Sequence, residues 1–430
     1  MQVLRGLIVF VVAAAIACGP NQAKPHDSSN SPDLGALVLC DTCDVDQDGY
    51  TIRMGDCNDF DPATHPGAAE VCYDHKDQDC DGVADQTCDD DGDGWALKAG
   101  KNGKGVDVPG GDCDDNDPFI NPGAYEVLAN GRDDDCDSHT DNPYPPCDGT
   151  LPANDAMSFP RSMDLCPPWL QSAQWNAHVD PNAHSILTNF GSFYKPQSGA
   201  NFVLLSTGIA VDEKSNRWVA PEPGTQFQSM EPNPAGMPGI ASHNVCTGSG
   251  ARTGPRTNDL VALTVTIKVP TNAKGFTFKS NFFTSEYPEF VGGFYNDMYY
   301  VLLDSKKFQG NIAFDMNGDA INVNNAFLTV CKDEPICGGI MNPKVQGHRC
   351  TPNSLAQLLG TGYELPDNTG QPYGGATGWL ATTAPVTFGE TITLTFVIYD
   401  DFDHMNDSSV LLDGFQWLFD DTILQTNPIG

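Results

Sequence analysis

The clearest alternation of hydrophobic and polar positions lies in the C-terminal half of the chain. From Val261 to Val269 every second residue is apolar, and the residues between them are alanine or polar. A period of two residues predicts a β-strand with one face in a core. Shorter apolar segments recur between loops rich in proline and glycine, such as 219–240 and 366–378. We expect the further strands at Phe202–Leu205, Phe276–Phe283, Met298–Leu303, Ile312–Phe314, Ile392–Tyr399 and Val410–Trp417.

Residues 148–430 are therefore expected to fold as a mainly β domain. Many short strands, turn residues between them and few convincing helical segments are typical of an antiparallel β-sandwich, here jelly-roll-like. Hydrophobic residues make up 40% of the chain, which is enough for a sizeable core. Because the N-terminal part is poor in aliphatic residues, that core must be C-terminal. We expect disulfides to hold its long loops, among Cys246, Cys331, Cys337 and Cys350.

A short apolar segment near the N-terminus has the pattern of a targeting signal. Arg5 precedes the apolar segment Leu7–Ala17, which is too short to span a bilayer as a stable anchor. We interpret residues 1–17 as a signal peptide and 18–39 as a lipidated N-terminus and flexible tether rich in Pro, Ser and Asn. An ordinary secretory signal cleaved near Ala17 fits the same pattern.

The end of this segment, Ala15-Ile16-Ala17-Cys18, resembles the lipobox of bacterial lipoproteins. The resemblance implies that Cys18 carries a lipid, becomes the first residue of the mature protein and anchors it in a membrane. Gly19, rather than Asp, follows the cysteine, which resembles proteins sent to the outer membrane. We therefore expect an exported protein that is lipid-anchored at the outer membrane or cell surface.

Between these two parts lies an acidic segment that occurs twice. The first copy runs from Asp44 to Gly82 within a domain expected at 40–88. The second runs from Asp89 to Ser138 within a domain expected at 89–147. Aspartate-rich segments are usually solvated and disordered. Here, however, glycine, proline, cysteine and acidic positions recur in register, which favours a folded repeat.

The charge of the chain supports a role for cations in this repeat. The formal net charge is −35, which argues against nucleic acid and anionic membrane surfaces as partners. Carboxylates packed together repel one another unless counter-ions neutralise them. Divalent cations would remove that repulsion and could then form the core of each repeat.

Each copy begins with the pattern D-x-D-x-D-G, in which alternate side chains converge on one point while the glycine allows a sharp turn. This is the first half of an EF-hand-type loop, and such oxygen ligands suit a hard cation, Ca²⁺ before Mg²⁺ or Mn²⁺. The expected ligands in copy one are Asp44, Asp46, Asp48, the Tyr50 carbonyl and Asp56; in copy two they are Asp89, Asp91, Asp93, the Trp95 carbonyl and Asp112, the last of these following an insertion at 96–111.

A second acidic group follows in each copy and predicts a second ion. Cys57 and Cys80 have the same separation as Cys113 and Cys136, so a disulfide across each pair would bring the two acidic ends of a copy together. The candidate ligands are Asn58, Asp61, Asp77 and Asp79 in copy one, and Asp114, Asp117, Asp133 and Asp135 in copy two.

These segments resemble the MopE-type metal-binding repeat of secreted bacterial proteins, and more loosely the acidic repeats of thrombospondins. The resemblance rests on D-x-D-x-D-G-Y/W, D-C-N/D-D-x-D-P, P-G-A-x-E-V and D-x-D-C-D. It implies a metal without specifying which one. Copy two departs from copy one at Leu128, where copy one has Cys72, and at Ser138, where it has Gly82.

The cysteine content fits an oxidising compartment. The chain has 15 cysteines, and without Cys18 an even number remains for disulfides. Cys40 and Cys43 have the spacing of half a zinc site. Disulfides are the preferred interpretation because a second pair with finger spacing is not evident in the sequence.

The C-terminal part contains a further set of segments with a recognisable pattern: Leu204–Ile209, Thr257–Leu260, Ser285–Val291 with Tyr295-Asn296-Asp297, and, towards the end, Val386–Gly389, Asp400-Asp401 and Asp407–Leu412. Together these segments resemble the choice-of-anchor L domain. That family is defined by its association with varied surface anchors, not by an activity. The resemblance implies surface display and a β-rich ectodomain.

Three acidic segments of this domain are candidates for other chemistry. Glu286, Glu289 and Asp297 could form a carboxylate pair for glycoside hydrolysis, fix a turn, or bind a structural cation with Asn296. Asp315-x-Asn317-Gly318-Asp319 fits half a calcium loop or a hairpin turn. Asp400, Asp401, Asp403 and Asp407, with His404 beside them, form an acidic loop that could bind a cation. The sequence has no Gly-x-Ser-x-Gly, His-Glu-x-x-His or phosphate-binding glycine loop, so catalysis is not expected.

The sequence therefore predicts a calcium-binding surface lipoprotein. Its acidic repeats would form a rigid stalk, and its β-sandwich would bind an extracellular glycan or another surface protein. A polysaccharide-active enzyme and a metal-scavenging protein are the alternatives, and oxygen-only ligands argue against the second of these.

Overall fold

The computed structural model describes residues 41–429 apart from 73, 86, 102–105, 222, 228–229, 233–255, 294, 334–349, 365–373 and 402. The chain divides into two compact units, Met1–Pro122 and Gly123–Gly430, so the boundary falls within the second acidic copy. The signal segment, Cys18, Cys40, Cys246 and Cys337 lie outside the described residues. In the part of the chain that is described, none of the helices has both the length and the apolar character needed to cross a membrane.

Turns dominate the described part of the first unit. Its regular elements are the 3-10 helix η1 (Ile52–Met54) and a two-stranded ribbon of β1 (Gly100–Lys101) and β2 (Asp107–Val108) in the insertion. Aspartate, glycine and asparagine favour turns because they tolerate left-handed backbone or hydrogen-bond their own backbone. The high density of these residues explains why this unit has so little helix or sheet.

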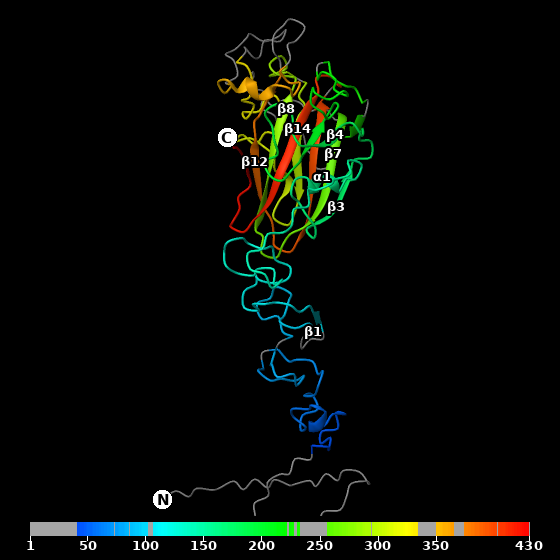
Figure 1. The fold of residues 1–430 in the computed structure, drawn as a ribbon, viewed down its shortest axis with the longest axis vertical. Coiled ribbons are helices and arrows are strands. Elements are labelled where there is room, and N and C mark those ends of the chain that lie inside the picture. The colour runs from blue at the N-terminus through cyan, green and yellow to red at the C-terminus, as the bar shows by residue number, and fades with distance from the viewer. Residues whose placement is uncertain are drawn as a thin grey trace, which may run out of the picture. The chain divides into compact units, whose positions relative to one another are not determined.

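The second unit is an antiparallel β-sandwich, as the sequence predicts (Figure 1). One sheet has the order β10-β9-β13-β7-β3, and β6 also pairs with β7. Its strands are β10 (Gln309–Asn311), β9 (Met298–Asp304), β13 (Thr391–Asp401), β7 (Arg256–Lys268), β3 (Leu170–Trp175) and β6 (Met230–Pro232).

The other sheet has the order β15-β12-β8-β14-β5-β4, and β11 also pairs with β8. Its strands are β15 (Gln425–Pro428), β12 (Leu380–Pro385), β8 (Gly275–Thr284), β14 (Ser408–Leu418), β5 (Phe202–Ser206), β4 (His184–Leu187) and β11 (Gly375–Ala376). Figure 1 shows β8, β12 and β14 side by side in this sheet. Two short helices, α1 (Ser158–Arg161) and η2 (Ser354–Leu358), lie in the connections.

Alternating side chains of the two sheets form the main core. The apolar positions of the predicted strands β7 and β13, such as Val265 and Leu394, are buried against Phe278 of β8 and Val410 of β14. Further apolar clusters lie beside the main core, one of them with Phe283 and Leu358 of η2. This explains why several strands lack a polar face.

One predicted strand is wrong in position. Ile312–Phe314 is expected as a strand, but β10 ends at Asn311, and Phe314 makes an isolated bridge to Ala320. The side chain of Asn311 explains the end of the strand. Its Oδ1 accepts the N–H of Val301 at 3.1 Å and that of Ala313 at 3.0 Å, so a side chain provides bonds that a continuing ladder would make.

Five strands of the two sheets begin or end at one end of the sandwich. β8 and β14 meet there through the pair Thr284–Ser408, and β7 and β13 through Thr257–Asp401. β9 begins there at Met298. Consequently the connection from β8 to β9 and the connection from β13 to β14 lie at the same end. Both connections carry buried carboxylates, among them Glu286, Asp297 and Asp407.

A buried carboxylate on β14 makes the stability of the sandwich depend on pH. Asp413 is fully buried at a register shift and accepts N–H groups from Gln197, Ser198 and Gly414. Burial raises its pKa to about 7, the three N–H donors oppose the rise, and the charge of Asp164 adds to it. The folded protein therefore binds this proton more tightly than the unfolded chain does, and this contribution to stability is lost as pH rises from about 4 to about 7.

We predict that Asp413→Asn removes this contribution to the pH dependence. Between pH 5 and pH 8 the unfolding temperature of the variant, measured relative to that of the wild type, should rise with pH, because the asparagine stays neutral while the wild-type carboxyl ionises. Tryptophan fluorescence is a suitable measurement, since five of the six tryptophans lie in the second unit. Equal changes of the unfolding midpoint with pH in both proteins would show that Asp413 does not titrate in this range.

Candidate metal centre

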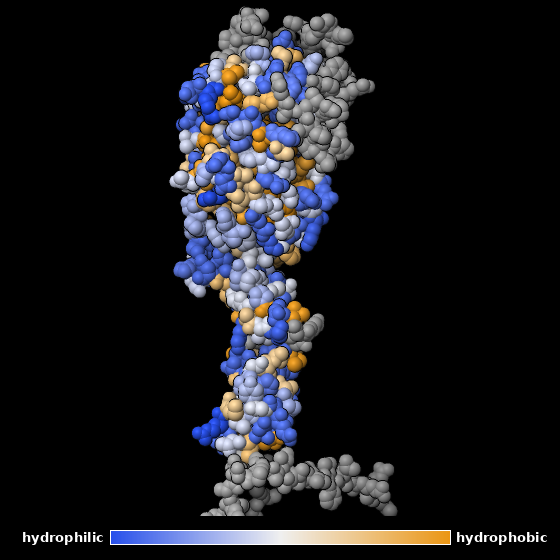
Figure 2. Space-filling view, turned by 90° about the vertical axis from the view of Figure 1, so that its right-hand side faces the viewer, coloured by the Kyte–Doolittle hydropathy of each residue, from blue (hydrophilic) through white to orange (hydrophobic). Residues whose placement is uncertain are grey.

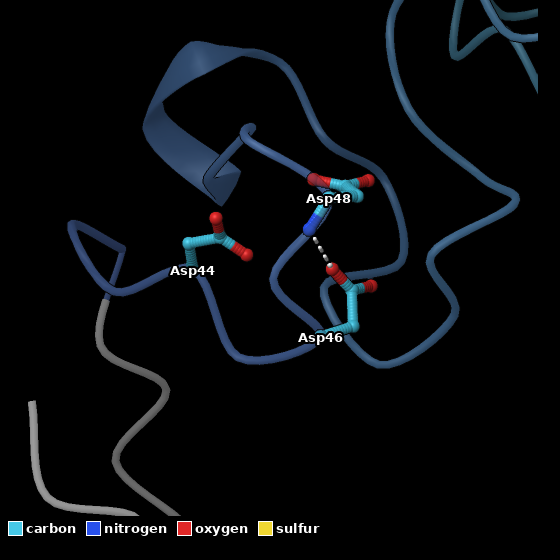
Figure 3. A group of neighbouring side chains, drawn as sticks. All are labelled: Asp44, Asp46 and Asp48. Atoms are coloured by element: carbon cyan, nitrogen blue, oxygen red, sulfur yellow. Dashed lines mark hydrogen bonds between the residues drawn. The ribbon is translucent and has the colours of Figure 1, made fainter.

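The first acidic loop is closed by its own carboxylates. Asp44 Oδ1 accepts the N–H of Gln47 at 2.6 Å, and its Oδ2 accepts the N–H of Gly49 at 3.0 Å. Asp46 and Asp48 follow on the same curl of backbone, and Asp46 Oδ1 accepts the N–H of Asp48 at 3.3 Å (Figure 3). Gly49 has φ +101°, a left-handed conformation that glycine adopts without the steric cost of a Cβ.

The same backbone arrangement occurs four times in the two copies. In each loop the first aspartate accepts the N–H of the residue five positions later. The three further pairs are Asp77–Gly82 at 2.8 Å, Asp89–Gly94 at 3.0 Å and Asp133–Ser138 at 2.9 Å. The sixth residue has positive φ in every loop, including Ser138 at +75°. The D-x-D-C-D segments are therefore turns of the same kind as the D-x-D-x-D-G segments.

Five carboxylates come together around the first loop of each copy. In copy one, Asp44, Asp46 and Asp48 form one group, and Asp46 also groups with Asp56 and Asp59. Within each group the candidate ligand atoms lie within 4.8 Å of one another. Copy two repeats the arrangement, with Asp91 as the shared member, in the groups Asp89-Asp91-Asp93 and Asp91-Asp112-Asp115.

Asp59 and Asp115 are the members that the sequence interpretation missed. Both are buried, and they hold the start of the loop in place, because Asp59 Oδ1 accepts the N–H of Val45 at 3.0 Å. Asp115 Oδ1 does the same for Asp90, also at 3.0 Å. The signal in the sequence is their recurrence two residues after the cysteine of D-C-N/D-D.

Three carboxylates of each copy have one oxygen bonded to backbone and one oxygen without a partner. Asp48 Oδ1 accepts the N–H of Tyr50 at 2.7 Å, and Asp56 Oδ1 accepts that of Asn58 at 2.8 Å. The second oxygens of Asp46, Asp48 and Asp56 are buried without a hydrogen-bond donor among the described residues. The unpartnered oxygens of copy two belong to the equivalent residues, Asp91, Asp93 and Asp112.

The electrostatics of these groups oppose ionisation in the absence of a cation. Burial raises the pKa of Asp93 to about 6, and the charges of Asp91 and Asp112 add to the effect. Burial likewise raises the pKa of Asp115 to about 6. A buried polar atom without a partner costs free energy, and more so when it is charged. A bound cation would satisfy these oxygens and favour their charged form.

A second acidic group involves the glutamate of P-G-A-x-E-V. Glu70 groups with Asp77 and Asp79, two of the ligands expected for a second ion. Glu70 is buried, and its Oε1 accepts the N–H groups of Gln78 and Asp79, both at 3.0 Å. Lys98 donates to the Oδ2 atoms of Asp79 and Asp81, so a protein cation already neutralises part of this group.

Copy two fixes its second loop in a similar way. Glu126 is buried and accepts the N–H of Asp134 at 3.0 Å and that of Asp141 at 2.6 Å. Asp133 accepts the N–H of Asp137 at 3.1 Å, while Asp135 Oδ2 accepts the hydroxyl of Tyr144 at 2.7 Å. Thus the second loops have more protein partners than the first loops.

The remaining expected ligands serve neighbouring turns. The carbonyl of Asn58 accepts the N–H of Asp61, and the carbonyl of Asp114 accepts that of Asp117, both at 2.9 Å. Asp61 and Asp117 then accept N–H groups two residues later, at Ala63 and Phe119, both at 3.3 Å. The Tyr50 ring stacks on His65 with centroids 4.8 Å apart. Ligation by the Tyr50 and Trp95 carbonyls stays a prediction.

Disulfides hold the first copy together. Cys57 bonds to Cys80, and Cys72 bonds to Cys88. Cys113 and Cys136 are both in disulfides. In the second unit the disulfides of the described residues include Cys147–Cys166 and Cys331–Cys350, the latter between two of the four loop cysteines singled out in the sequence.

Comparison with known families agrees with this geometry. Residues 56–93 and 112–142 match the Cu-binding MopE family model, described as "Putative metal-binding motif", and residues 170–416 match the choice-of-anchor L domain. The second match covers more than half of the chain, which therefore belongs to the choice-of-anchor L domain family. The protein thus combines two MopE-type metal-binding segments with that domain. Together with the disulfides, these matches indicate an exported, surface-anchored protein.

Other comparisons add little. No curated protein matches the chain. A solved structure, the β-glucosidase of Kluyveromyces marxianus in complex with glucose, matches 38% of this chain and 12% of its own at 11% identity. With a TM-score of 0.13, this likeness carries no argument about fold or activity.

The geometry predicts different roles for two neighbouring aspartates. Asp59→Asn should weaken Ca²⁺ binding to copy one by about tenfold or more, because it removes a charge from the five-carboxylate group while keeping an acceptor for Val45. The matched control Asp61→Asn should change the affinity much less, because Asp61 serves the next turn. Calorimetric titration of the two variants measures the difference. A larger loss for Asp61→Asn would favour the ligand set expected from sequence.

Proposed function

We propose that the acidic repeats bind Ca²⁺ and form a rigid stalk that presents the β-sandwich at the cell surface. The observation that carries the proposal is the recurrence of the same three buried, unpartnered carboxylate oxygens in both copies. A chance defect in packing would not recur at equivalent residues, whereas a cation site repeated with the sequence would.

The chemistry of the ligands favours calcium over copper. The groups around Asp46 and Asp91 consist of aspartates, without histidine or cysteine. Oxygen donors suit Ca²⁺ and Mg²⁺, whereas Cu(I) and Zn²⁺ prefer thiolate or imidazole. Ca²⁺ accepts six to eight oxygens in flexible geometry, which fits a site built from five carboxylates and irregular turns.

Calcium should decide whether the repeats are folded. At a free Ca²⁺ concentration 100-fold above the dissociation constant, one site adds roughly 2.7 kcal/mol to stability. We expect the full-length protein in saturating Ca²⁺ to resist protease cleavage within residues 41–142, and to be cleaved there rapidly in chelator. Mass spectrometry of the reduced peptides locates the cuts.

The same protease assay tests which residues bind the metal and which metal they bind. The double variant Asp46→Asn with Asp91→Asn should lose most of the protection by Ca²⁺, because each substitution removes the shared member of a five-carboxylate group. Asp107→Asn changes an exposed acid of the insertion and should behave as the wild type. Protection by Cu²⁺ or Zn²⁺ but not by Ca²⁺ would instead support metal scavenging.

The anchor in this proposal is a lipid on Cys18. The lipobox resemblance supports it, and membership of the choice-of-anchor L family supports surface display. The stalk would then hold the sandwich away from the membrane, where it can meet an extracellular partner.

An aromatic pocket in the second unit supports a glycan as that partner. The pocket has a volume of about 500 Å³, and its walls include Tyr125, Tyr144, Trp169 and Trp417, with Asp164 among them. Tyr125 and Tyr144 lie with ring centroids 4.8 Å apart. The buried Nε1 of Trp169 has no acceptor among the described residues. Aromatic rings can cover the C–H face of a sugar, while the carboxylate and the indole N–H can bind its hydroxyls.

A glycan panel tests this part of the proposal. Tyr125→Ala should lower the affinity for a bound glycan by about tenfold or more, because it removes a ring from the wall of the pocket. Phe193→Ala is the control, since Phe193 is exposed on the same unit but does not line the pocket. If no glycan binds, or if both variants bind like the wild type, the pocket is not a glycan site.

A further inference from the structure

The sandwich contains its own group of buried carboxylates, remote in sequence from the repeats. Glu286, Asp297, Asp400 and Asp407 have side chains that are at most 3% exposed. Glu286 follows β8, Asp297 precedes β9, Asp400 is the last but one residue of β13 and Asp407 precedes β14. These strands belong to both sheets and meet at the same end of the sandwich. The fold therefore unites two acidic segments that the sequence could only treat separately.

A β-bulge lies beside one of these carboxylates, Asp400. The ladder between β7 and β13 shifts register between the pairs Ile398–Val261 and Asp400–Asn258, so Asp259 and Leu260 lie opposite Tyr399. Asp259 has φ +49°, in the left-handed region. Such bulges re-aim side chains, and backbone strain of this kind persists where the surrounding structure requires it. The extra residue lies beside Asp400.

The protein satisfies only part of this group. Asp297 donates its N–H to Glu286 Oε2 at 3.0 Å, and Thr225 donates to both carboxylate oxygens of Asp407 at 3.0 Å. By contrast, both oxygens of Asp400 and Oδ2 of Asp297 are buried and make no hydrogen bond of normal geometry among the described residues; the nearby hydroxyls of Thr207 and Ser408 only oppose the rise in the pKa of these two acids. A fully buried carboxylate with two unpartnered oxygens is rare, because its desolvation is so unfavourable.

Among the described side chains, no lysine or arginine forms an ion pair with any of these four acids. His404 lies nearby, but its Nδ1 is 3.0 Å from Asp259 Oδ2. Burial raises the pKa of Asp400 well above its usual range, and the charges of Asp297 and Asp407 raise it further. The β13–β9 ladder pairs Tyr399 with Met298, so Asp400 and Asp297 are the next residues on these two neighbouring strands.

We propose that Asp297 and Asp400, with Glu286 and Asp407 beside them, form a calcium site that ties the two sheets together at this end of the sandwich. The donors are oxygens, which selects a hard cation. Ca²⁺ fits better than Mg²⁺, because Mg²⁺ usually retains several waters and this group is enclosed by protein. The site lies outside the repeats, so the calcium proposal for the sandwich and the calcium proposal for the repeats can be refuted separately.

Hydrogen–deuterium exchange on the full-length protein tests the site locally. Exchange is read in peptides covering 256–261, 284–298 and 396–410, which report on this end of the sandwich and not on the repeats. At free Ca²⁺ about 100 times the dissociation constant, a single site lowers the fraction of open molecules about 100-fold. We therefore expect exchange in these peptides to slow by up to about 100-fold when Ca²⁺ replaces chelator.

The variant Asp400→Asn should abolish this protection. In chelator it should also raise the unfolding temperature of the sandwich, because it removes one of four mutually repelling charges. Asp297→Asn is the second variant and should behave in the same way. Asp413→Asn is the control: it is a buried acid on β14, but backbone N–H groups satisfy it, so protection by Ca²⁺ should persist.

Asp400→Asn is expected to have two effects of opposite direction: it removes the protection by Ca²⁺, and it raises the unfolding temperature in chelator. Protection in the wild type together with its loss in Asp400→Asn supports the site, whether or not the repeats bind Ca²⁺. Equal protection by Ca²⁺ in the wild type and in Asp400→Asn overturns the proposed site, and so does a lack of protection in the wild type. The carboxyl groups would then be neutralised by protons that they share. Protection by Mg²⁺ but not by Ca²⁺ overturns the assignment to calcium.

Discussion

This structure depends on one constraint: carboxylate oxygens are buried without a hydrogen-bond donor among the described residues. In the first loop of each copy, the aspartates use one oxygen to bond the backbone, and for three of them the other oxygen remains unpartnered. The bonded oxygens give the loop its shape, and the unpartnered oxygens favour the binding of a positive charge. Because the same side chains serve both roles, the proposed cation binding would be coupled to folding, as it is in small metal-dependent domains. Apolar packing contributes little here, since the repeats are poor in aliphatic residues.

The sandwich is held together mainly by apolar packing, yet it also has buried carboxylates with unpartnered oxygens at one end. Its core is apolar over most of its length, with Val265, Phe278 and Leu394 between the sheets. At the end of the sandwich where β8, β9, β13 and β14 meet, four carboxylates are buried beside the apolar side chains. A cation there would act on the packing of two sheets, whereas a cation in the repeats would act on the folding of a turn.

Local sequence patterns were sufficient for some features and not for others. The alternation from Val261 to Val269 identified β7, and the spacing of Asp44, Asp46 and Asp48 identified the first loop, because both depend on neighbours along the chain. Strand β15 (Gln425–Pro428) lacks an apolar pattern, and its place is fixed by pairing with β12. The recurrence of Asp59 and Glu70 in the second copy marks them in the sequence, but it does not reveal their role, because each acts on backbone at least eight residues away. The joining of Asp297 to Asp400 depends on the whole topology, which no local pattern specifies.

The two disulfides of the first copy interleave, since Cys72 lies between Cys57 and Cys80, and Cys80 lies between Cys72 and Cys88. Cutting the backbone once at any point from Cys57 to Cys88 therefore never separates the chain into two molecules, because at least one disulfide always spans the cut. A secreted enzyme that nicked this segment would leave everything C-terminal to it still attached to everything N-terminal to it. Release would require both a cut and a reductant, and the second is scarce outside the cell. The interleaved disulfides therefore keep the chain covalently connected after a single cut, which is separate from any contribution to thermodynamic stability.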